Sequence, residues 1–187
     1  MNAVPRPARF SDADRALLLA AARSAIRSRV CDGQTAPLPY GTPRLREPQG
    51  AFVTLRQDGH LRGCIGNVQA ESPLIRTVAD CAAAAATEDS RFAPLQPEEI
   101  ESTVIEISIL GPLVDVRDPD DIVVGRHGLM VSRGPCRGLL LPQVALEQAW
   151  DRPRFLQETC LKAGLEPDAW MRGTRIQAFE AEIICET

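Results

Sequence analysis

Lysine, aromatic residues and long apolar runs are all scarce in this sequence of 187 residues. No apolar run approaches the roughly 18 residues of a membrane-spanning helix. The amino end also lacks the basic stretch followed by an apolar segment that marks a secretory signal, so we expect a cytoplasmic protein with no membrane association. The six cysteines are scattered. Because they show neither the CxxC pairs of a zinc site nor the density of a small disulfide scaffold, we interpret them as reduced thiols.

The charge balance disfavours bulk binding to nucleic acid and leaves only a local basic patch to be considered. The formal net charge is -4, and a chain of that sign does not attract phosphates over its whole surface. Twenty of the 21 basic residues are arginine, a skew that we attribute to GC-rich coding. With 44% hydrophobic and 25% charged residues, the composition is that of an ordinary globular chain. Its length fits a single domain over residues 1–187.

Helix, turn and strand patterns are readable along most of the chain. Ser11 precedes an apolar run as a helix-capping residue, and Asp58-Gly59 has the positive φ tolerance of a tight hairpin. The Pro-rich stretch 31–49 opposes regular structure. In the first half we expect a helix at about 12–29, a hairpin over 51–65, a helix that Ser72-Pro73 caps and that runs to about 87, and a strand over 103–110. In the second half we expect a hairpin over 128–141 with a Gly134-Pro135 turn, helices near 142–150 and 153–163, and a strand over 175–185. Gly164 closes the helix at 153–163.

The two halves of the chain, about 50–110 and 125–185, repeat one order of elements: hairpin, helix, strand. Each half carries an Arg-Gly pair in its second hairpin strand, Arg62-Gly63 and Arg137-Gly138. Two shared residues can arise by chance, so we infer an internal duplication from the order of elements. Hairpins that alternate with helices favour an α+β fold over an all-parallel sheet.

The segment 61–66, Leu-Arg-Gly-Cys-Ile-Gly, is the strongest chemical signal. On an extended strand Arg62 and Cys64 share a face, so that a guanidinium would lie beside the thiol and favour the thiolate. Gly63 and Gly66 would let another backbone or a ligand approach closely. The alternative is a small buried cysteine in a strand beside a glycine bulge, and the clustering of Arg, Cys and two Gly is compatible with both interpretations.

Five segments, taken together, match the pattern of a known family. They are Leu61–Gly66, Glu88–Phe92, Glu106–Leu110, Gly125–Leu129, and Leu141–Val144 with Glu147–Trp150. In this order they resemble the AMMECR domain family, whose bacterial and archaeal members are called AmmeMemoRadiSam system protein A. The resemblance covers about residues 12–185. Ala149, where the family often has Gly, and the stretch 31–49 depart from the pattern.

The resemblance implies a fold and a set of companion proteins, but no particular reaction. The implied fold is α+β, with two related hairpin, helix and strand halves around a single curved mixed sheet with flanking helices. The shared motifs would line a cleft. The family name refers to a Memo-type protein, similar to extradiol dioxygenases, and to a radical S-adenosylmethionine protein. We therefore expect both as partners in a shared modification pathway.

His127 is one of only two histidines in the sequence. The turn at 125–128 would present it beside the start of a strand, where it is a candidate general base. The alternative is a turn histidine hydrogen-bonded to the backbone. Its place in a family motif favours the cleft, whereas His60 has no such match and is interpreted as a hairpin residue.

Glu106 is a carboxylate in an otherwise apolar strand, with Ile105 and Ile107 on the opposite face. Burial of a lone carboxylate is costly, so this side chain must meet water, a cation or a hydrogen-bond donor. A partnership with His127 would orient the imidazole and raise its basicity. A partnership with Arg62 would be structural, and an exposed place on an edge strand is the third alternative.

Four further polar residues are candidates for ligand binding. Asp89 and Arg91 follow a helix end, where a local cap or ion pair is favoured over a catalytic dyad. Gln143 is a polar candidate for the wall of the cleft, as is Gln148.

Two distant histidines and dispersed thiols make no defined metal site. Cys64, Glu106 and His127 would form a ligand set only if the fold brought them together. The sequence contains no phosphate-binding loop, dinucleotide fingerprint or nucleophile elbow, so we expect no cofactor.

The leading functional hypothesis is an enzyme or enzyme component that acts on a small molecule in a cleft. Cys64 would be the nucleophile or covalent anchor, and Arg62 would contact an anion. His127 and Glu106 would form an acid/base pair, and we expect these two side chains and Cys64 to converge. The alternative is a non-catalytic binding or adaptor module for a protein partner or RNA.

Overall fold

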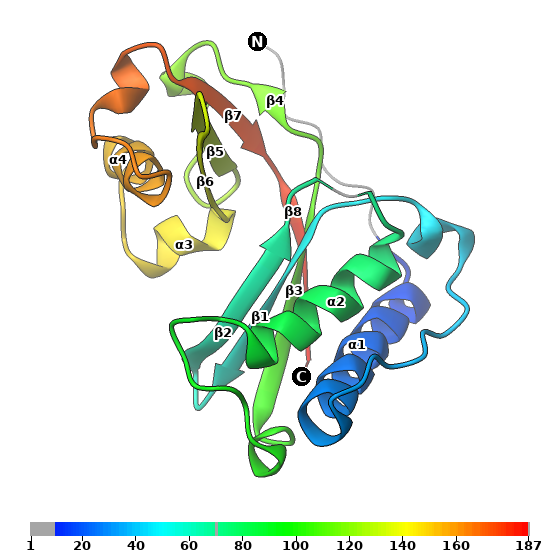
Figure 1. The fold of residues 1–187 in the computed structure, drawn as a ribbon. Coiled ribbons are helices and arrows are strands. Elements are labelled where there is room, and N and C mark those ends of the chain that lie inside the picture. Colours follow the sequence, from blue (N-terminus) through cyan, green and yellow to red (C-terminus); the bar gives the residue numbers. More distant parts are fainter. Residues whose placement is uncertain (1–9, 70, 187) are drawn as a thin grey trace. The chain divides into compact units, whose positions relative to one another are not determined.

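The computed structural model describes residues 10–69 and 71–186, which form two compact units. Within the described chain, the larger unit comprises residues 10–110 and 182–186, and the smaller unit comprises residues 111–181. Each unit contains a four-stranded sheet (Figure 1). The α+β class is therefore confirmed, but the single curved mixed sheet is wrong, because the strands divide between two sheets. The prediction of one domain over residues 1–187 stays a prediction.

The larger unit combines two long helices with a sheet of strand order β2-β1-β3-β8. Strand β1 pairs antiparallel with both β2 and β3. Short 3-10 helices at Pro43–Arg46 and Pro97–Glu99 and a π turn at Ser28–Asp32 lie in its connections. Its main elements are α1 (Asp12–Arg27), β1 (Ala51–Gln57), β2 (His60–Asn67), α2 (Leu74–Thr87), β3 (Thr103–Leu110) and β8 (Ala181–Cys185).

The smaller unit has a sheet of strand order β4-β7-β5-β6, and all three pairings are antiparallel. Short 3-10 helices occur at Pro119–Asp121 and Ala169–Met171. Its main elements are β4 (Val114–Asp115), β5 (Gly128–Arg133), β6 (Cys136–Leu140), α3 (Pro142–Glu147), α4 (Arg152–Lys162) and β7 (Arg175–Phe179). Over the residues that the structure describes, every helix is too short or too polar to cross a membrane.

Most of the predicted caps and turns are present. The Ser11 side chain accepts a hydrogen bond from the Asp14 N-H at 3.1 Å and so caps α1. Asp58 and Gly59 both have positive φ, 51° and 78°, as the tight hairpin between β1 and β2 requires. Gly164, with φ 72°, follows the end of α4.

Two predicted boundaries are wrong. Pro73 lies at the N-cap of α2 rather than in its first turn, and no side chain caps that end, because the Ser72 hydroxyl does not serve as the cap acceptor. The strand expected over 175–185 is divided at Glu180 into β7 and β8, which belong to different sheets. The Glu180 carbonyl accepts from the Gly111 N-H at 2.8 Å, which fixes the backbone at the break.

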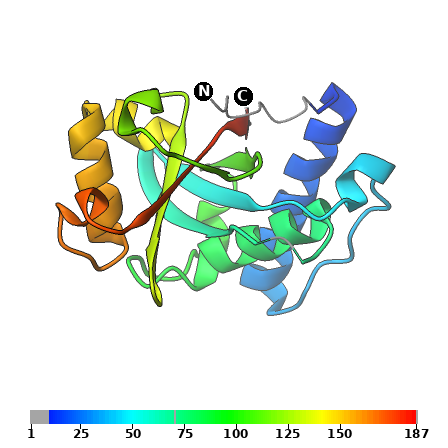
Figure 2. The ribbon, with the colours of Figure 1, turned by 90° about the horizontal axis from the view of Figure 1, so that it is seen from above.

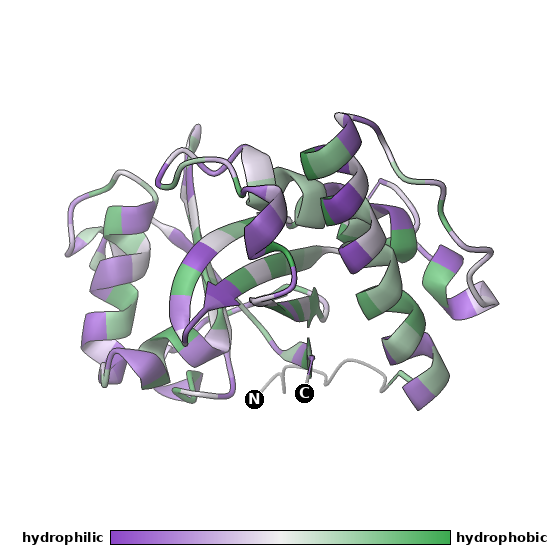
Figure 3. Ribbon diagram, turned by 90° about the horizontal axis from the view of Figure 1, so that it is seen from below, coloured by the Kyte–Doolittle hydropathy of each residue, from purple (hydrophilic) through white to green (hydrophobic). Residues whose placement is uncertain are grey.

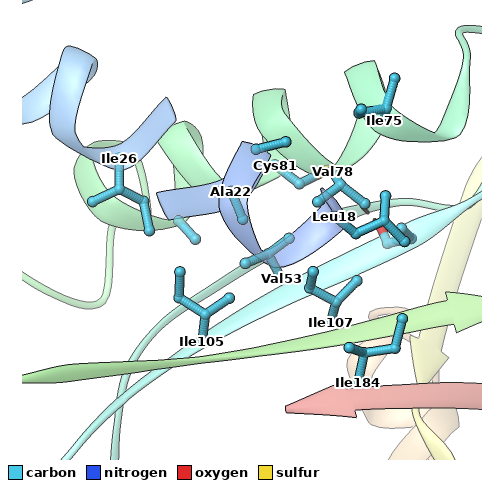
Figure 4. Close-up of a cluster of buried hydrophobic side chains, with 14 of the residues drawn as sticks. Leu18, Ala22, Ile26, Val53, Ile75, Val78, Cys81, Ile105, Ile107 and Ile184 are labelled. Carbon is cyan, nitrogen blue, oxygen red and sulfur yellow. Dashed lines mark hydrogen bonds between the residues drawn. The ribbon is translucent and has the colours of Figure 1, made fainter. Parts of the chain in front are cut away.

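The core of the larger unit lies between the helices and one face of the sheet. Helices α1 and α2 lie side by side against that face (Figures 1 and 2). Apolar and polar residues alternate along both helices (Figure 3), as expected of helices with one buried side. Figure 4 shows how the side chains of the helices meet those of the strands. The labelled contributors are Leu18, Ala22 and Ile26 from α1, Ile75, Val78 and Cys81 from α2, and Val53, Ile105, Ile107 and Ile184 from the strands.

The smaller unit has its own core, built around α4 and the inner strands of its sheet. Phe155 and Leu156 from α4 are essentially inaccessible, and they pack with Leu129 and Val131 from β5. Each unit therefore has its own buried apolar cluster.

The strand order supports the inferred duplication. In the larger unit β1 pairs with β2 on one side and with β3 on the other. In the smaller unit β5 pairs in the same way with β6 and β7. The fourth strand of each sheet is supplied by the segment that comes after the other half in the sequence. β4 follows β3 in the chain but pairs with β7, and β8 follows β7 but pairs with β3. The predicted order of hairpin, helix and strand is confirmed in both halves.

Candidate functional site

A polar row crosses the sheet of the larger unit on the face opposite α1 and α2. Thr54 on β1 pairs with Cys64 on β2 and with Glu106 on β3, so the three side chains lie on one face of the sheet. Their neighbours Val53, Leu55 and Ile105 belong to the core on the other face. The Cys64–Thr54–Glu106 row therefore brings together two of the three predicted catalytic residues.

The row contains a direct contact to the Cys64 thiol. The Thr54 hydroxyl donates to Cys64 Sγ at 3.3 Å. Thr54 is 5% exposed, whereas Cys64 is half-buried. A hydroxyl donor at a sulfur stabilises the thiolate more than the thiol.

Cys64 is also held through its backbone by Asp89 and Arg91. The Cys64 N-H donates to Asp89 Oδ2 at 2.8 Å, and Arg91 Nη2 donates to the Cys64 carbonyl at 3.3 Å. Arg91 binds Asp89 through two further bonds, from Nε at 2.9 Å and from Nη2 at 2.6 Å. The hydrogen bond from Arg91 holds the pKa of the Asp89 carboxyl well below its usual range. The predicted local ion pair is confirmed.

Arg62 has a carboxylate partner that the sequence did not indicate. Its Nε and Nη2 donate to the two oxygens of Glu99 at 3.1 and 3.0 Å, and its Nη1 donates to the Ala93 carbonyl at 2.8 Å. The register between β1 and β2 shifts by one residue at this point. Leu55 pairs with Gly63 but Arg56 pairs with Leu61, so Arg62 lies in a bulge opposite no residue of β1. Arg62 therefore does not pair with Glu106, which was one of the alternatives for that carboxylate.

Gly63 and Gly66 serve close packing inside the larger unit. A Cβ on Gly63 would lie 2.2 Å from the Ala85 carbonyl oxygen of α2, and one on Gly66 would lie 2.2 Å from the Phe52 ring. The sequence predicted that these glycines admit either another part of the chain or a ligand. Close approach of another part of the chain explains both glycines. Their predicted contact with a ligand stays a prediction.

Glu106 lies near a cation at the far end of the row. Arg56 Nε on β1 is 3.9 Å from Glu106 Oε2, and the Glu106 side chain is 15% exposed. This partner was not among the alternatives drawn from the sequence. An arginine two residues along β1 from Thr54 lies on the same face of the sheet, and alternation along that strand is the signal that would have indicated it.

His127 lies in the smaller unit and is bound to its own turn. The Val123 N-H donates to His127 Nδ1 at 3.2 Å, and the His127 N-H donates to the Val123 carbonyl at 2.9 Å. Burial, followed by the charge of Arg126, lowers the pKa of His127, and Glu180 opposes this. A neutral imidazole whose Nδ1 accepts a hydrogen bond carries its proton on Nε2. The geometry favours the turn histidine over the general base, and the convergence of His127 with Cys64 and Glu106 stays a prediction.

The remaining candidates do not define a ligand site. Gln143 lies in the first turn of α3, in the smaller unit. Within residues 10–69 and 71–186, no three His, Cys, Asp or Glu side chains gather as they would around a metal ion. All six cysteines are free thiols. Burial raises the pKa of the Cys81 thiol to about 11 and also raises that of Cys160, which disfavours both as nucleophiles.

The smaller unit has apolar residues at two of the three positions that are equivalent to the polar row. Gly63 and Gly138 occupy equivalent places on the second hairpin strands, because each lies against helix backbone: Gly63 against Ala85 of α2, and Gly138 against Ala163 at the C-cap of α4. One residue along, Met130 pairs with Leu139 and with Gln177, where the larger unit has the Cys64–Thr54–Glu106 row. The architecture therefore accepts apolar residues at the positions of Thr54 and Cys64, so packing alone does not demand these two.

The segments that carry the resemblance lie on both units, and a family model accounts for them. The model of the AMMECR1 family matches residues 19–184. The chain belongs to the AMMECR1 family. The predicted family membership is confirmed, and the match spans the hairpins, helices and strands of both halves.

Relatives within the AMMECR1 family match over nearly the whole chain. A protein from Thermofilum pendens is 43% identical over 197 aligned residues, which cover 96% of this chain and 92% of the relative. A protein from Methanosarcina acetivorans is 42% identical, with 88% and 87% covered. The crystal structure of the uncharacterized protein PH0010 from Pyrococcus horikoshii is 39% identical and matches with a TM-score of 0.89 over 93% of this chain and 92% of that one. The fold described above is thus similar to one solved by crystallography.

Three residues that shape the site were missed in the sequence. Thr54 carried no motif, and only its cross-strand position beside Cys64 reveals it. Glu99 lies in a short 3-10 helix that no pattern placed next to Arg62. These contacts span 10 residues for Thr54 and 37 for Glu99, and the third, Arg56, depends on pairing between β1 and β3.

Proposed function

We propose that this AMMECR1-family protein is an enzyme, or a component of one, that modifies a small molecule through Cys64. The observation that carries the proposal is the hydrogen bond from the Thr54 hydroxyl to the Cys64 sulfur. A donor at the sulfur stabilises the thiolate, which is the nucleophilic form of cysteine. The apolar Met130 and Leu139 at the equivalent positions of the smaller unit support a specialised role for this pair.

In this proposal Glu106 is the acid/base group. It lies on the same face as Cys64, one strand beyond Thr54, so the backbones of Cys64 and Glu106 are about 10 Å apart, twice the spacing of paired strands. A small molecule bound across Thr54 would contact both side chains. His127, whose Nδ1 is occupied by the Val123 N-H, would take part only as a hydrogen-bond donor through Nε2.

A second candidate function is a non-catalytic binding or adaptor module. It is favoured by the bonds of Arg62, Arg91 and His127, each of which is engaged with groups of its own unit. The partners expected from the resemblance, a Memo-type protein and a radical S-adenosylmethionine protein, belong to both candidates as proposals. The cytoplasmic location is likewise a proposal.

The reactivity of the thiols separates the two candidates. We expect Cys64 to be the first of the six cysteines to be alkylated by substoichiometric iodoacetamide at pH 8, as resolved by peptide mass spectrometry. If Cys31 or Cys136 is labelled first while Cys64 is inert, the nucleophile role of Cys64 is wrong and the non-catalytic adaptor module becomes the favoured function. A screen for covalent adducts with a metabolite extract, comparing wild type with Cys64→Ser, would then identify the substrate class.

The contribution of Thr54 is tested by a matched pair of variants. Thr54→Val keeps the shape and removes the donor, and a neutral hydrogen bond is worth about 0.5–1.5 kcal/mol. We therefore expect Cys64 to be alkylated about 2- to 10-fold more slowly in Thr54→Val. Thr54→Ser retains the hydroxyl and should keep the wild-type rate within about twofold. Equal rates in wild type and Thr54→Val would remove the observation on which the proposal rests.

A further inference from the structure

The outer edge of β2 is bound by side chains where a neighbouring strand would otherwise lie. β2 is an outermost strand of its sheet, with β1 on its inner side. At Cys64 the outward N-H is bound by Asp89 and the outward carbonyl by Arg91. An acceptor and a donor on two nearby side chains thus replace the backbone groups of a strand, which also protects the edge against pairing with another chain.

The two side chains are themselves held firmly. Asp89 is 7% exposed and follows the last turn of α2, where the Glu88 N-H donates to the Ala84 carbonyl at 2.7 Å. Arg91 reaches the carboxylate through two side-chain bonds, and its backbone N-H adds a third at 3.2 Å. A bidentate pair of this kind is geometrically specific, so it transmits the position of the end of α2 to Cys64.

We propose that Asp89 and Arg91 are positioning residues for Cys64, which lock its peptide groups and set the balance of charge beside its thiol. We rest this on the proposed role of Cys64. The pair brings one negative and one positive charge to the two outward peptide groups of the same residue. While Asp89 and Arg91 are both present, the effects of their opposite charges on a Cys64 thiolate largely cancel. The Thr54 hydroxyl then acts on the sulfur without a net electric field from the outer edge of β2.

Other charged groups around Cys64 are compensated in the same way. Arg62 is paired with Glu99 on the same strand edge, and Glu106 lies near Arg56 two strands away. Removal of either member of the Asp89–Arg91 pair would therefore leave an unbalanced charge next to Cys64. The two removals have opposite signs, because a cation favours a thiolate and an anion disfavours it.

The test is the rate of alkylation of Cys64 at pH 7 in full-length variants, with peptide mass spectrometry as the readout. Asp89→Asn keeps an oxygen that can accept from the Cys64 N-H but leaves Arg91 without its counter-charge, so we expect a rate at least about threefold higher. Arg91→Gln leaves Asp89 uncompensated, and we expect a rate at least about threefold lower. Arg91→Lys retains the cation and should restore most of the wild-type rate.

Glu88→Gln is the matched control, because it breaks an ion pair with Arg29 beside Asp89 at the end of α2 and makes no bond to the backbone of Cys64. It should leave the rate within about twofold of wild type. A merely structural role would change Asp89→Asn and Arg91→Gln in the same direction, by loosening β2, and that result overturns the inference. If circular dichroism shows that Asp89→Asn does not fold, the alkylation rates of Cys64 in Arg91→Gln and Arg91→Lys are compared instead. Equal rates in these two variants also overturn the inference. An inert Cys64 in wild type is a different outcome and removes the proposed function itself.

Discussion

At the scale of single residues, the described structure separates groups that are engaged in holding the fold from those that face the polar row. Arg62 and Asp89 are bound to arginine or glutamate partners in the larger unit. Cys64 instead receives a hydroxyl donor at its sulfur. His127 closes a turn in the smaller unit through Nδ1. In the proposed function the chemistry at this scale is therefore assigned to Cys64, and His127 is assigned to the stability of its own turn.

The role of His127 makes a prediction about stability against pH. Its pKa is lowered from the usual 6.5 by burial, so below that pH the unfolded chain binds a proton that the folded protein does not. The free energy of unfolding should fall as the pH drops below 6.5 and level off below the folded pKa, with a slope of at most about 1.4 kcal/mol per pH unit. Urea denaturation between pH 7 and 5 measures this slope.

His127→Gln keeps an acceptor for the Val123 N-H but cannot titrate, so the slope between pH 6.5 and 5 should largely disappear. His60→Gln, at the exposed start of β2, is the control and should retain it. An unchanged slope in His127→Gln would show that another group is responsible.

At the scale of elements, contacts between the sheet and the helices depend on glycine. Gly63 on β2 lies against the backbone of α2, and Gly138 on β6 lies against the backbone at the end of α4. The atoms involved are the Ala85 oxygen and the Ala163 nitrogen, which cannot move aside as the end of a flexible side chain can. The glycine of each Arg-Gly pair thus meets the same packing requirement in both sheets, as the inferred duplication predicts.

Gly63→Ala should destabilise the protein by about 1–3 kcal/mol or more, because the new Cβ would overlap the Ala85 carbonyl and force β2 away from α2. Gly138→Ala should do the same against α4, since its Cβ would lie 2.4 Å from the Ala163 nitrogen. Thermal and urea denaturation measure both. Gly41→Ala is the control, because its nearest contact would be the Leu45 Cβ at 3.0 Å, and its effect should be smaller. A Gly63→Ala variant as stable as wild type would contradict the close approach.

At the scale of the whole molecule, two related halves have kept one strand order and differ in what they place on it. The hairpin, helix and third strand recur, and each sheet is completed by a strand that follows the other half. At equivalent positions one half has Cys64 and Thr54, and the other has Leu139 and Met130. The proposed chemistry belongs to one half and is not a consequence of the architecture.

This difference can be tested by moving the cysteine. In a Cys64→Ser background, Leu139→Cys places a thiol at the equivalent site, beside Met130 in place of Thr54. Because a methionine supplies no donor, we expect the new thiol to be alkylated about 2- to 10-fold more slowly than Cys64 in wild type, as resolved by peptide mass spectrometry. Comparable rates would show that strand position alone, and not the Thr54 hydroxyl, makes the thiol reactive.

The sequence by itself determined the features that depend on neighbours along the chain. The Asp58-Gly59 hairpin, the cap at Ser11 and the repeated order of elements all follow from local backbone preferences and apolar spacing. The family was likewise readable, because its motifs are short and contiguous.

Only the tertiary structure decided how strands pair and which side chains meet. The break at Glu180, which sends β7 and β8 into different sheets, depends on the bond to Gly111, 69 residues away in the chain. The partners of Cys64 are Thr54 and Asp89, 10 and 25 residues away. Strand register and the end of α2 set these contacts, and no local pattern encodes a register between distant segments.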